Sequence, residues 1–390
     1  MDERIRAEVI VIGAGIAGAS IACWLAPRAR VVIIEGESMP GYHATGRSAA
    51  MFIETYGGEQ VRALTRASRP FFEHPPGGFA GAPLLTPRGA LVVATPEQRD
   101  QLDRHWQLLQ SLSADSRRLN RDEVTRMLPV LRAERLLGAT YEPDACDLDV
   151  HALLHGYLRV ARRAGASLAC GTVVSAIERS GHEWLVQAGE QVYQAPIVIN
   201  AAGAWADVIA RLAGVPLIGI EPRRRSAFTF APPAGLDTRR WPLLIGADED
   251  WYLKPDAGML LGSPANADPV EPQDVQPEEL DIALGVDRIE RMTTLTIRRP
   301  RHKWAGLRSF VADGGLVGGF AASAPGFFWL AGQGGYGIQT SAAMGEGCAA
   351  LALGLPLPSA IADCGLSAAM LSPLRLQPID PPAEADASSA

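Results

Sequence analysis

The stretch Val9-Ile-Val-Ile-Gly-Ala-Gly-Ile-Ala-Gly18 is the most informative part of the sequence, because an apolar strand leads directly into three closely spaced glycines. A second apolar run, Val31 to Ile34, ends in Glu35, seventeen residues after Gly18. A strand, a tight turn, a helix and a second strand with an acid at its tip are typical of a dinucleotide site. The glycines allow the turn, the approach of a pyrophosphate and close helix packing, while the acid accepts hydrogen bonds from ribose hydroxyls.

The same stretch raises the alternative of a membrane span or a signal peptide, since residues 9–26 carry no charge. Its glycines and alanines make a poor hydrocarbon anchor, and residues 2–8 mix both signs of charge where a secretory signal would be basic. We therefore expect a cytoplasmic protein. The basic cluster 298–303 leaves open a peripheral contact with the inner face of the membrane or with an acceptor protein, although a solvated loop is the simpler interpretation.

Composition excludes several classes of function. A chain of 390 residues with 47% hydrophobic content can bury a large core, and we expect two lobes. A net charge of −7 disfavours nucleic acid as a partner. The five cysteines are scattered and the seven histidines lack ligand spacing, so neither a disulfide framework nor a metal site is expected. The motifs of serine hydrolases and phosphate-binding loops do not occur.

Two later segments repeat the pattern of a strand followed by small residues. We predict a strand over residues 191–200, which ends at Ala201-Ala-Gly203, and a strand over 327–331 followed by a glycine-rich loop and a helix over 338–353. A helix over 149–164 and a strand over 167–174 precede them, while residues 222–295 suggest β-hairpins. One nucleotide lobe interrupted by a β-rich lobe favours a flavin over a nicotinamide, because nicotinamide dehydrogenases usually complete that lobe contiguously.

Motifs spread almost from end to end resemble those of one family. They are Gly13-Ala-Gly-Ile-Ala-Gly-Ala-Ser, Pro40-Gly-Tyr-His-Ala-Thr-Gly-Arg-Ser-Ala-Ala, Asn200-Ala-Ala-Gly-Ala-Trp, Arg224-Arg-Ser-Ala-Phe, Tyr252-Leu-Lys-Pro-Asp-Ala-Gly-Met-Leu-Leu-Gly-Ser-Pro-Ala-Asn, Trp304-Ala-Gly-Leu-Arg-Ser-Phe and Gln333-Gly-Gly-Tyr-Gly-Ile-Gln-Thr. The chain resembles the FAD-dependent D-amino-acid oxidase and dehydrogenase superfamily, and within it the bacterial D-arginine dehydrogenase type of D-amino-acid dehydrogenase.

This resemblance implies an α/β fold in which an FAD-binding Rossmann-like domain of the D-amino-acid oxidase type carries an inserted, β-rich α+β substrate domain. The expected FAD-binding parts are residues 1–80, 145–220 and 300–375. The expected substrate-binding parts are residues 81–144 and 221–299. The tail 376–390, rich in Pro, Ala and acids, is expected to be disordered.

The resemblance also implies non-covalent FAD and no metal. The loop from Thr45 to Ala50 is expected beside the isoalloxazine ring, and the last glycine-rich loop at the pyrimidine end of that ring. The expected FAD contacts are Gly13, Gly15, Ile16, Ala17, Gly18, Glu35, Thr45, Gly46, Arg47, Ser48, Ala49, Val174, Ala202, Gly203, Trp205, Gly332, Gly334, Gly335, Tyr336, Gly337, Ile338, Gln339 and Thr340.

The implied reaction moves a hydride from the α-carbon of a D-amino acid to FAD, giving an imino acid that water hydrolyses to a 2-oxo acid and ammonia. Arg308 would bind the substrate carboxylate bidentately. The other substrate contacts implied by the resemblance are Tyr56, Arg225, Tyr252, the carbonyl of Gly335, and Gln339. A dehydrogenase with an unidentified electron acceptor is expected rather than an oxidase, and no dedicated general base is required.

Three positions of the implied side-chain pocket depart from the D-arginine type. Ala90 stands where an acid meets the cationic side chain, and Met51 and Ile53 replace a histidine and a threonine. Because an unpaired guanidinium is costly to bury, we predict a preference for apolar over cationic D-amino acids. Glu54 is an alternative partner for a cation, although a surface glutamate is the simpler interpretation. Arg223 and Arg224 are interpreted as solvated charges at a strand edge.

Two alternatives remain open. The protein could oxidise a secondary amine, glycine or a 2-hydroxy acid, since Arg308 and the tyrosines would hold any of these carboxylates. A more remote alternative is a non-catalytic flavin-binding subunit, against which the intact Arg308, Tyr252 and Gln339 argue.

Overall fold

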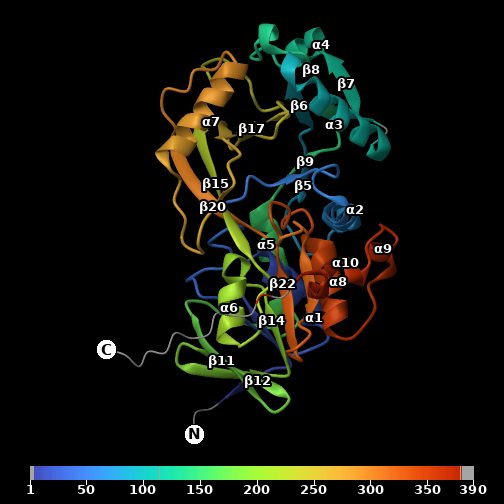
Figure 1. Cartoon of the computed structure of the whole chain (residues 1–390), viewed down its shortest axis with the longest axis vertical. Coiled ribbons are helices and arrows are strands. Elements are labelled where there is room, and N and C mark those ends of the chain that lie inside the picture. Colours follow the sequence, from blue (N-terminus) through green and yellow to red (C-terminus); the bar gives the residue numbers. More distant parts are fainter. Residues whose placement is uncertain (1–3, 114, 378, 380–390) are drawn as a thin grey trace.

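The computed structural model describes residues 4–113, 115–377 and 379. The chain is elongated, with a parallel sheet in one half and a large mixed sheet in the other (Figure 1). Most of the tail that we expect to be disordered lies outside the described residues. Within them, no helix combines the length and the apolar character needed to cross a bilayer.

The parallel sheet is built from strands far apart in sequence. Its strands pair in parallel, except that the edge strand β21 is antiparallel to β22. In spatial order the strands are β10 (Ser167–Ala169), β3 (Val31–Ile34), β2 (Val9–Ile12), β14 (Ile197–Asn200), β22 (Phe327–Ala331) and β21 (Val317–Phe320). The sheet therefore unites the glycine-motif strand with the two later strands predicted to end in small residues.

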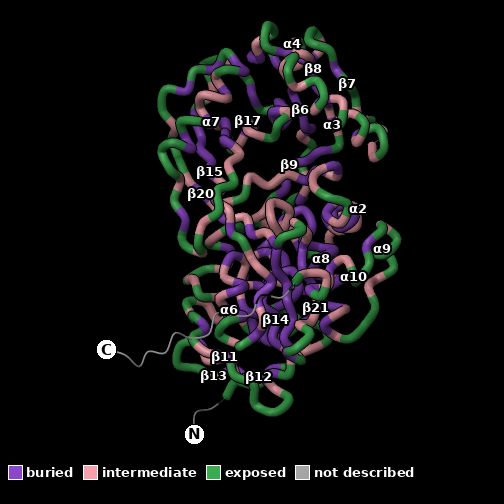
Figure 2. Tube along the Cα trace, in the orientation of Figure 1, coloured by how far each residue is buried: buried purple, intermediate pink, exposed green. Residues whose placement is uncertain are grey.

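Both faces of this sheet are covered, because alternate residues of its strands enter two different cores. Val9 and Val11 pack with the helices on one face, whereas Ile10 and Ile12 pack with the opposite cover. Buried residues are accordingly dense around β14 and α8 (Figure 2). The helices of the first core are α1 (Ile16–Leu25), α2 (Glu59–Glu73), α5 (Val150–Arg163) and α8 (Ser341–Ala352).

The other face of the parallel sheet is covered by helix α6 (Ala206–Leu212) and by a second, mostly antiparallel sheet. The strands of this second sheet are β1 (Ile5–Arg6), β13 (Gln191–Ala195), β12 (Glu183–Ala188) and β11 (Val174–Ser180). The prediction of one strand over 191–200 was wrong, because Pro196, which has no amide hydrogen, separates β13 from β14 in different sheets. The predicted strand 167–174 likewise divides between β10 and β11.

The large mixed sheet forms the other half of the molecule. Its members in spatial order are β19 (Asp268–Pro269), β15 (Glu221–Phe230), β18 (Met259–Ser263), β17 (Tyr252–Asp256), β16 (Leu243–Gly246), β6 (Ala90–Ala94), β8 (Gly138–Glu142) and β7 (Arg117–Asn120), with β20 (His302–Phe310) paired to β15. The helices in this half are α3 (Arg99–Leu112), α4 (Arg121–Met127) and α7 (Glu279–Met292).

Helix α7 corrects the prediction of hairpins throughout 222–295. Its buried apolar residues Ile282, Ile289 and Met292 recur at helical rather than strand spacing. They close the core of the large sheet together with Phe228 and Leu260.

A small sheet joins the two halves. It pairs β9 (Cys146–Leu148) with β4 (Met51–Phe52) on one side and β5 (Leu85–Pro87) on the other. Short helices α9 (Ser359–Ala362) and α10 (Ala368–Leu371) complete the fold, with single helical turns at Pro96–Gln98, Ala133–Arg135, Gly203–Trp205 and Pro373–Arg375.

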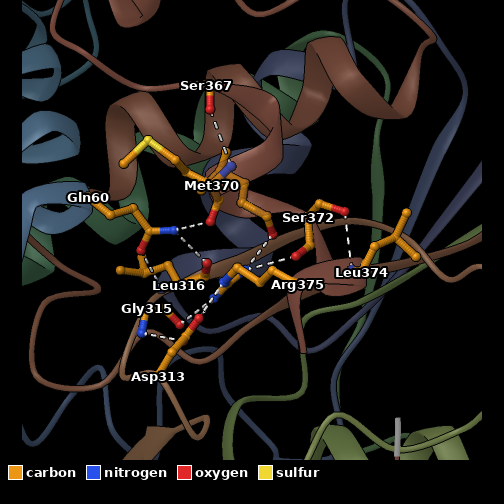
Figure 3. A network of polar contacts seen from close by, with 10 residues as sticks. Gln60, Asp313, Gly315, Leu316, Ser367, Met370, Ser372, Leu374 and Arg375 are labelled. Carbon is orange, nitrogen blue, oxygen red and sulfur yellow. Dashed lines mark hydrogen bonds and ion pairs between the residues drawn. The ribbon is translucent and has the colours of Figure 1, made fainter. Parts of the chain in front are cut away.

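Side-chain hydrogen bonds fasten the last described segment to the body of the protein (Figure 3). Gln60 at the start of α2 donates to the carbonyls of Leu316 and Met370, at 3.0 and 2.6 Å, and accepts from the amide of Leu316 at 2.7 Å. Arg375 pairs with Asp313 at 2.7 Å and donates to the carbonyl of Gly315. The C-terminal helices are therefore bound to both α2 and the loop before β21.

Candidate active site

The first glycine loop has no room for side chains. Gly13 has φ +101°, and a Cβ there would lie 2.5 Å from the carbonyl oxygen of Ala201. A Cβ on Gly18 would lie 1.9 Å from the carbonyl oxygen of Gly13. These contacts agree with the expected roles of a tight turn and of close packing between helix and strand.

Glu35 at the tip of β3 is held beside this loop. Its carboxylate accepts a hydrogen bond from the amide of Ala14 at 2.7 Å and another from the amide of Glu37 at 2.9 Å. Each carboxylate oxygen can accept more than one hydrogen bond, so the side chain keeps capacity for a ribose hydroxyl.

A cavity of about 440 Å³ begins at this loop and extends to the large mixed sheet. The expected FAD residues that line it are Gly13, Gly15, Ile16, Ala17, Glu35, Thr45, Arg47, Ser48, Ala49, Val174, Ala202, Gly203, Trp205, Gly334, Gly335, Gly337 and Ile338. The structure also places Arg225, Tyr252 and Arg308 in the lining of this cavity.

Six expected contacts lie outside the lining of this cavity: Gly18, Gly46, Gly332, Tyr336, Gln339 and Thr340. Gln339 is buried, donates to Thr65 Oγ1 at 2.9 Å, and accepts from the amide of Ile53 at 3.2 Å. In this arrangement it holds the segment that follows β4.

The lining also includes residues that the sequence did not lead us to expect in contact with FAD. Gln333 is the second residue of the last glycine-rich loop, and its buried Nε2 has no hydrogen-bond partner among the described residues. His43 lies 2.8 Å from Glu37, and its ring lies 4.6 Å from that of Trp205. His43 and Gln333 are neighbours in sequence of the loops predicted to contact FAD, and this proximity is the feature that could have predicted their position in the cavity.

The loop after β3 is fastened from both halves of the molecule. Thr45 Oγ1 accepts from the amide of Ile16 at 3.0 Å, which ties the loop to the start of α1. Trp304 Nε1 donates to the carbonyl of Arg47 at 3.0 Å. Buried Lys254 donates to the carbonyl of Ala49 at 2.8 Å. The loop is therefore rigidly placed along the cavity.

These features fit FAD. The glycine turn leaves the N-terminus of a helix accessible to a diphosphate, and Glu35 lies beside the position expected for a ribose. The unpartnered donor of Gln333 provides an unused hydrogen bond further along the wall.

Arg308 lies against the last glycine-rich loop. A Cβ on Gly335 would lie 2.7 Å from an amino group of Arg308, so a side chain there would displace the guanidinium. Burial opposes its charge, but the nearby oxygens of Tyr56 and Tyr252 more than offset burial and raise the pKa of Arg308. Its charge is therefore secure, and it can bind a carboxylate.

Arg225 reinforces this positive site. Burial, and then the charge of Arg308, lower the pKa of Arg225 to about 10, which still leaves it protonated at neutral pH. Its buried Nε has no hydrogen-bond partner among the described residues. Two neighbouring guanidinium groups with an unused donor form a site for an anion.

Arg224 corrects the expectation of a solvated charge. It points to the opposite face of β15, is 9% exposed, and pairs with Asp281 at 3.0 Å and with Glu278 of the segment leading into α7. Arg223 has a half-exposed side chain paired with Glu221. Because side chains alternate between the two faces of a strand, Arg224 forms structural ion pairs on one face of β15, whereas Arg225 faces the cavity on the other.

An apolar cluster adjoins the cavity through Tyr252, which belongs to both. The other members of the cluster are Met51, Ile53, Tyr56, Ala90, Ala145, Leu243 and Ile245. The structure therefore brings the expected pocket positions together. Glu54 points elsewhere, because it forms an ion pair with Arg69 of α2.

The sequence interpretation missed Glu142, the last residue of β8. It pairs directly across the sheet with Ala90, is 4% exposed, and accepts a hydrogen bond from Thr55 Oγ1. Burial raises the pKa of Glu142 to about 7 against the opposing effect of the Thr55 hydrogen bond. Nothing in its sequence context distinguishes this glutamate from an exposed one.

A dinucleotide cradle that ends at paired guanidinium groups defines a class, the oxidoreductases that act through a bound dinucleotide. The chain belongs to the FAD dependent oxidoreductase family, whose model matches residues 8–351. FAD is therefore its cofactor, as in the L-α-glycerophosphate oxidase of Mycoplasma pneumoniae, whose FAD-bound structure has a TM-score of 0.81 at 17% identity and covers 97% of both chains.

Relatives within the family are named for different amines. Human mitochondrial dimethylglycine dehydrogenase is 24% identical over 69% of this chain, which spans 32% of that protein's length. Glycine oxidase of Geobacillus kaustophilus is 27% identical over 66% of this chain and 70% of its own. The structure of that oxidase has a TM-score of 0.79 and covers 90% of this chain and 95% of its own, at 24% identity.

Proposed function

We propose that this protein oxidises D-amino acids with apolar side chains and passes the electrons to an acceptor other than oxygen. The observation that carries the proposal is the pair Arg225 and Arg308, whose guanidinium groups face the cavity beside Gly335. The resemblance to D-amino-acid dehydrogenases supports the D configuration, and the cluster around Ala90 supports the apolar preference.

The residues of the chain bind and orient the substrate. Arg308 and Arg225 take the carboxylate, and Tyr252 and Tyr56 can donate to it. The carbonyl of Gly335 accepts a hydrogen bond from the substrate amine. Orienting the α-carbon in this way is the main contribution of the protein to rate.

Bound FAD supplies the acceptor for the hydride that leaves the α-carbon. The neutral amine donates its lone pair as the hydride leaves and the carbon–nitrogen double bond forms, which gives a protonated imino acid. Water then converts this imino acid to a 2-oxo acid and ammonium. The neutral amine drives this step, so no side chain of the site has to act as a general base.

Anaerobic mixing of the holoprotein with single D- and L-amino acids tests the proposal. We expect apolar D-amino acids to bleach the flavin absorbance, with little effect from their L-enantiomers or from D-arginine. Air-saturated buffer then separates an oxidase from a dehydrogenase, because only an oxidase reoxidises the flavin rapidly without an added acceptor.

A second candidate is the oxidation of glycine or a secondary amine that bears a carboxylate. The matches to glycine oxidase and dimethylglycine dehydrogenase favour it, and the same arginine pair would hold such substrates. Bleaching by glycine or N-methylated glycines, but by no larger D-amino acid, would replace the first proposal with this one.

A further inference from the structure

Glu142 lies on the sheet face that forms the wall of the proposed side-chain pocket. Directly paired residues of neighbouring strands share a face, and Ala90 pairs with Glu142 on one side and with Leu243 on the other. Ala90 and Leu243 belong to the apolar cluster that adjoins the cavity through Tyr252. A carboxyl group therefore stands one strand away from the position where the expected acid is missing.

The charges immediately around this carboxyl are acidic. Glu54 and Asp144 both disfavour its ionised form, in addition to burial. Arg69 of α2 is committed to Glu54 and Glu73. Among the described residues, the hydrogen bonds that favour the Glu142 carboxylate come from Thr55, through its Oγ1 and its backbone.

The basic groups on the other neighbouring elements also have partners other than Glu142. His105 of α3 contacts Thr140 at 2.7 Å, and burial lowers the pKa of this histidine. Asp147 pairs with both Arg88 and Lys254 between the small sheet and β17. Glu142 thus forms no ion pair with a described residue, although it is almost fully buried.

We propose that Glu142 sets the side-chain preference of the substrate site and makes that preference depend on pH. The neutral carboxyl is compatible with an apolar side chain, whereas the carboxylate pairs with a cationic one. A cationic substrate brings the countercharge that the pocket lacks, and it offsets the cost of ionising a buried acid. This inference rests on the proposed oxidation of D-amino acids.

The ratio of kcat/KM for D-arginine to kcat/KM for D-norleucine tests the inference. Both substrates carry the same α-amine and carboxylate, so ionisation of those groups largely cancels in the ratio, while the guanidinium stays charged throughout. Because the pKa of Glu142 is about 7, we expect the ratio to rise about tenfold between about pH 6 and about pH 8. A flat ratio in the unmodified protein overturns the inference.

Glu142→Gln is the matched variant, since it keeps the side-chain size and an acceptor for Thr55 but does not ionise. We expect its ratio to stay flat across the same range. A rise equal to that of the unmodified protein would assign the pH dependence to another group.

Thr55→Val gives an independent test that does not depend on whether the Glu142→Gln variant folds. It removes the side-chain hydrogen bond that favours the carboxylate and leaves the one from the Thr55 backbone, so the midpoint of the ratio should move to higher pH. An unmoved midpoint overturns the assignment to Glu142. Failure of the proposed function is distinguishable, because neither D-substrate would then reduce the flavin of the unmodified protein at any pH.

Discussion

The two walls of the cavity are built in different ways. On the side of the parallel sheet, much of the wall consists of glycines and other small residues that come from short contiguous motifs, among them Gly13, Gly15, Ala17, Gly334 and Gly335. On the side of the large mixed sheet, the wall consists of long polar side chains, Arg225, Tyr252 and Arg308, from three different strands.

Because of this difference, we expect the two walls to respond differently to mutation. Where a wall is formed by glycines and backbone, it tolerates few added atoms. A wall of side chains tolerates changes of shape but depends on the charge and position of single groups. Substitutions in each wall can therefore test the comparison directly.

The largest effect is expected from Arg308→Met. Removing one partner of a desolvated charge pair costs about 2–5 kcal/mol, so kcat/KM for the best D-amino acid should fall about 30- to 4,000-fold. The flavin spectrum should persist, because this change lies in the substrate wall. Arg301→Met, at an exposed position just before β20, is the matched control. Equal losses in both variants would contradict the assignment of Arg308.

Gly18→Ala tests the close packing of α1 behind the backbone wall. The added Cβ would lie 1.9 Å from the carbonyl of Gly13, and this overpacking should cost about 3 kcal/mol and weaken FAD binding about a hundredfold. Retained flavin after extensive dialysis measures the effect. Gly81→Ala is the control, since its Cβ would meet no atom within 4 Å. Similar flavin retention in both variants would mean that the close helix packing does not matter.

Glu142→Gln should change stability in a pH-dependent way. The pKa of Glu142 is raised from 4.5 to about 7 in the folded protein, so ionising it disfavours folding as pH rises through that window. The variant should therefore gain about 3 kcal/mol over the unmodified protein between about pH 4 and about pH 8. Denaturant unfolding at both pH values measures this gain. If the difference in free energy of unfolding between the variant and the unmodified protein were the same at both pH values, Glu142 would not be a buried acid that ionises in this range.

Ala90→Glu gives the smallest expected effect. A carboxylate at this position would pair with a cationic side chain, and kcat/KM for D-arginine relative to D-norleucine should rise about tenfold near neutral pH. D-norleucine serves as the internal control within the variant. An unchanged ratio would mean that Ala90 does not contact the substrate side chain, and it would contradict the placement of Glu142 beside that side chain.

Local features of the fold were predictable because they depend on neighbours in sequence. The helix expected over 149–164 is α5, and Asp149 caps it by accepting from the amide of Ala152 at 2.8 Å. The turn at Gly13 and the acid at Glu35 follow from the same kind of short-range pattern. The lobe boundaries and the individual FAD and substrate roles stay predictions.

Strand partners and faces were less predictable. Pro196 divides an apolar run between two sheets, and the spacing of Ile282, Ile289 and Met292 forms a helix inside an apparent series of hairpins. Arg224 and Arg225 are adjacent in the chain, yet one meets the acids near α7 and the other faces the cavity. The partners of these two arginines depend on which elements pack against each face of β15.

The glycine turn, the apolar strand before it and the acid after it follow from local sequence, because steric freedom and hydrogen bonding within a few dozen residues specify that unit. The position of Glu142 opposite Ala90, and that of Arg225 beside Arg308, depend instead on tertiary packing. The physical reason is that strand register and burial, set by long-range packing, determine which charged groups meet and which of them lose their water.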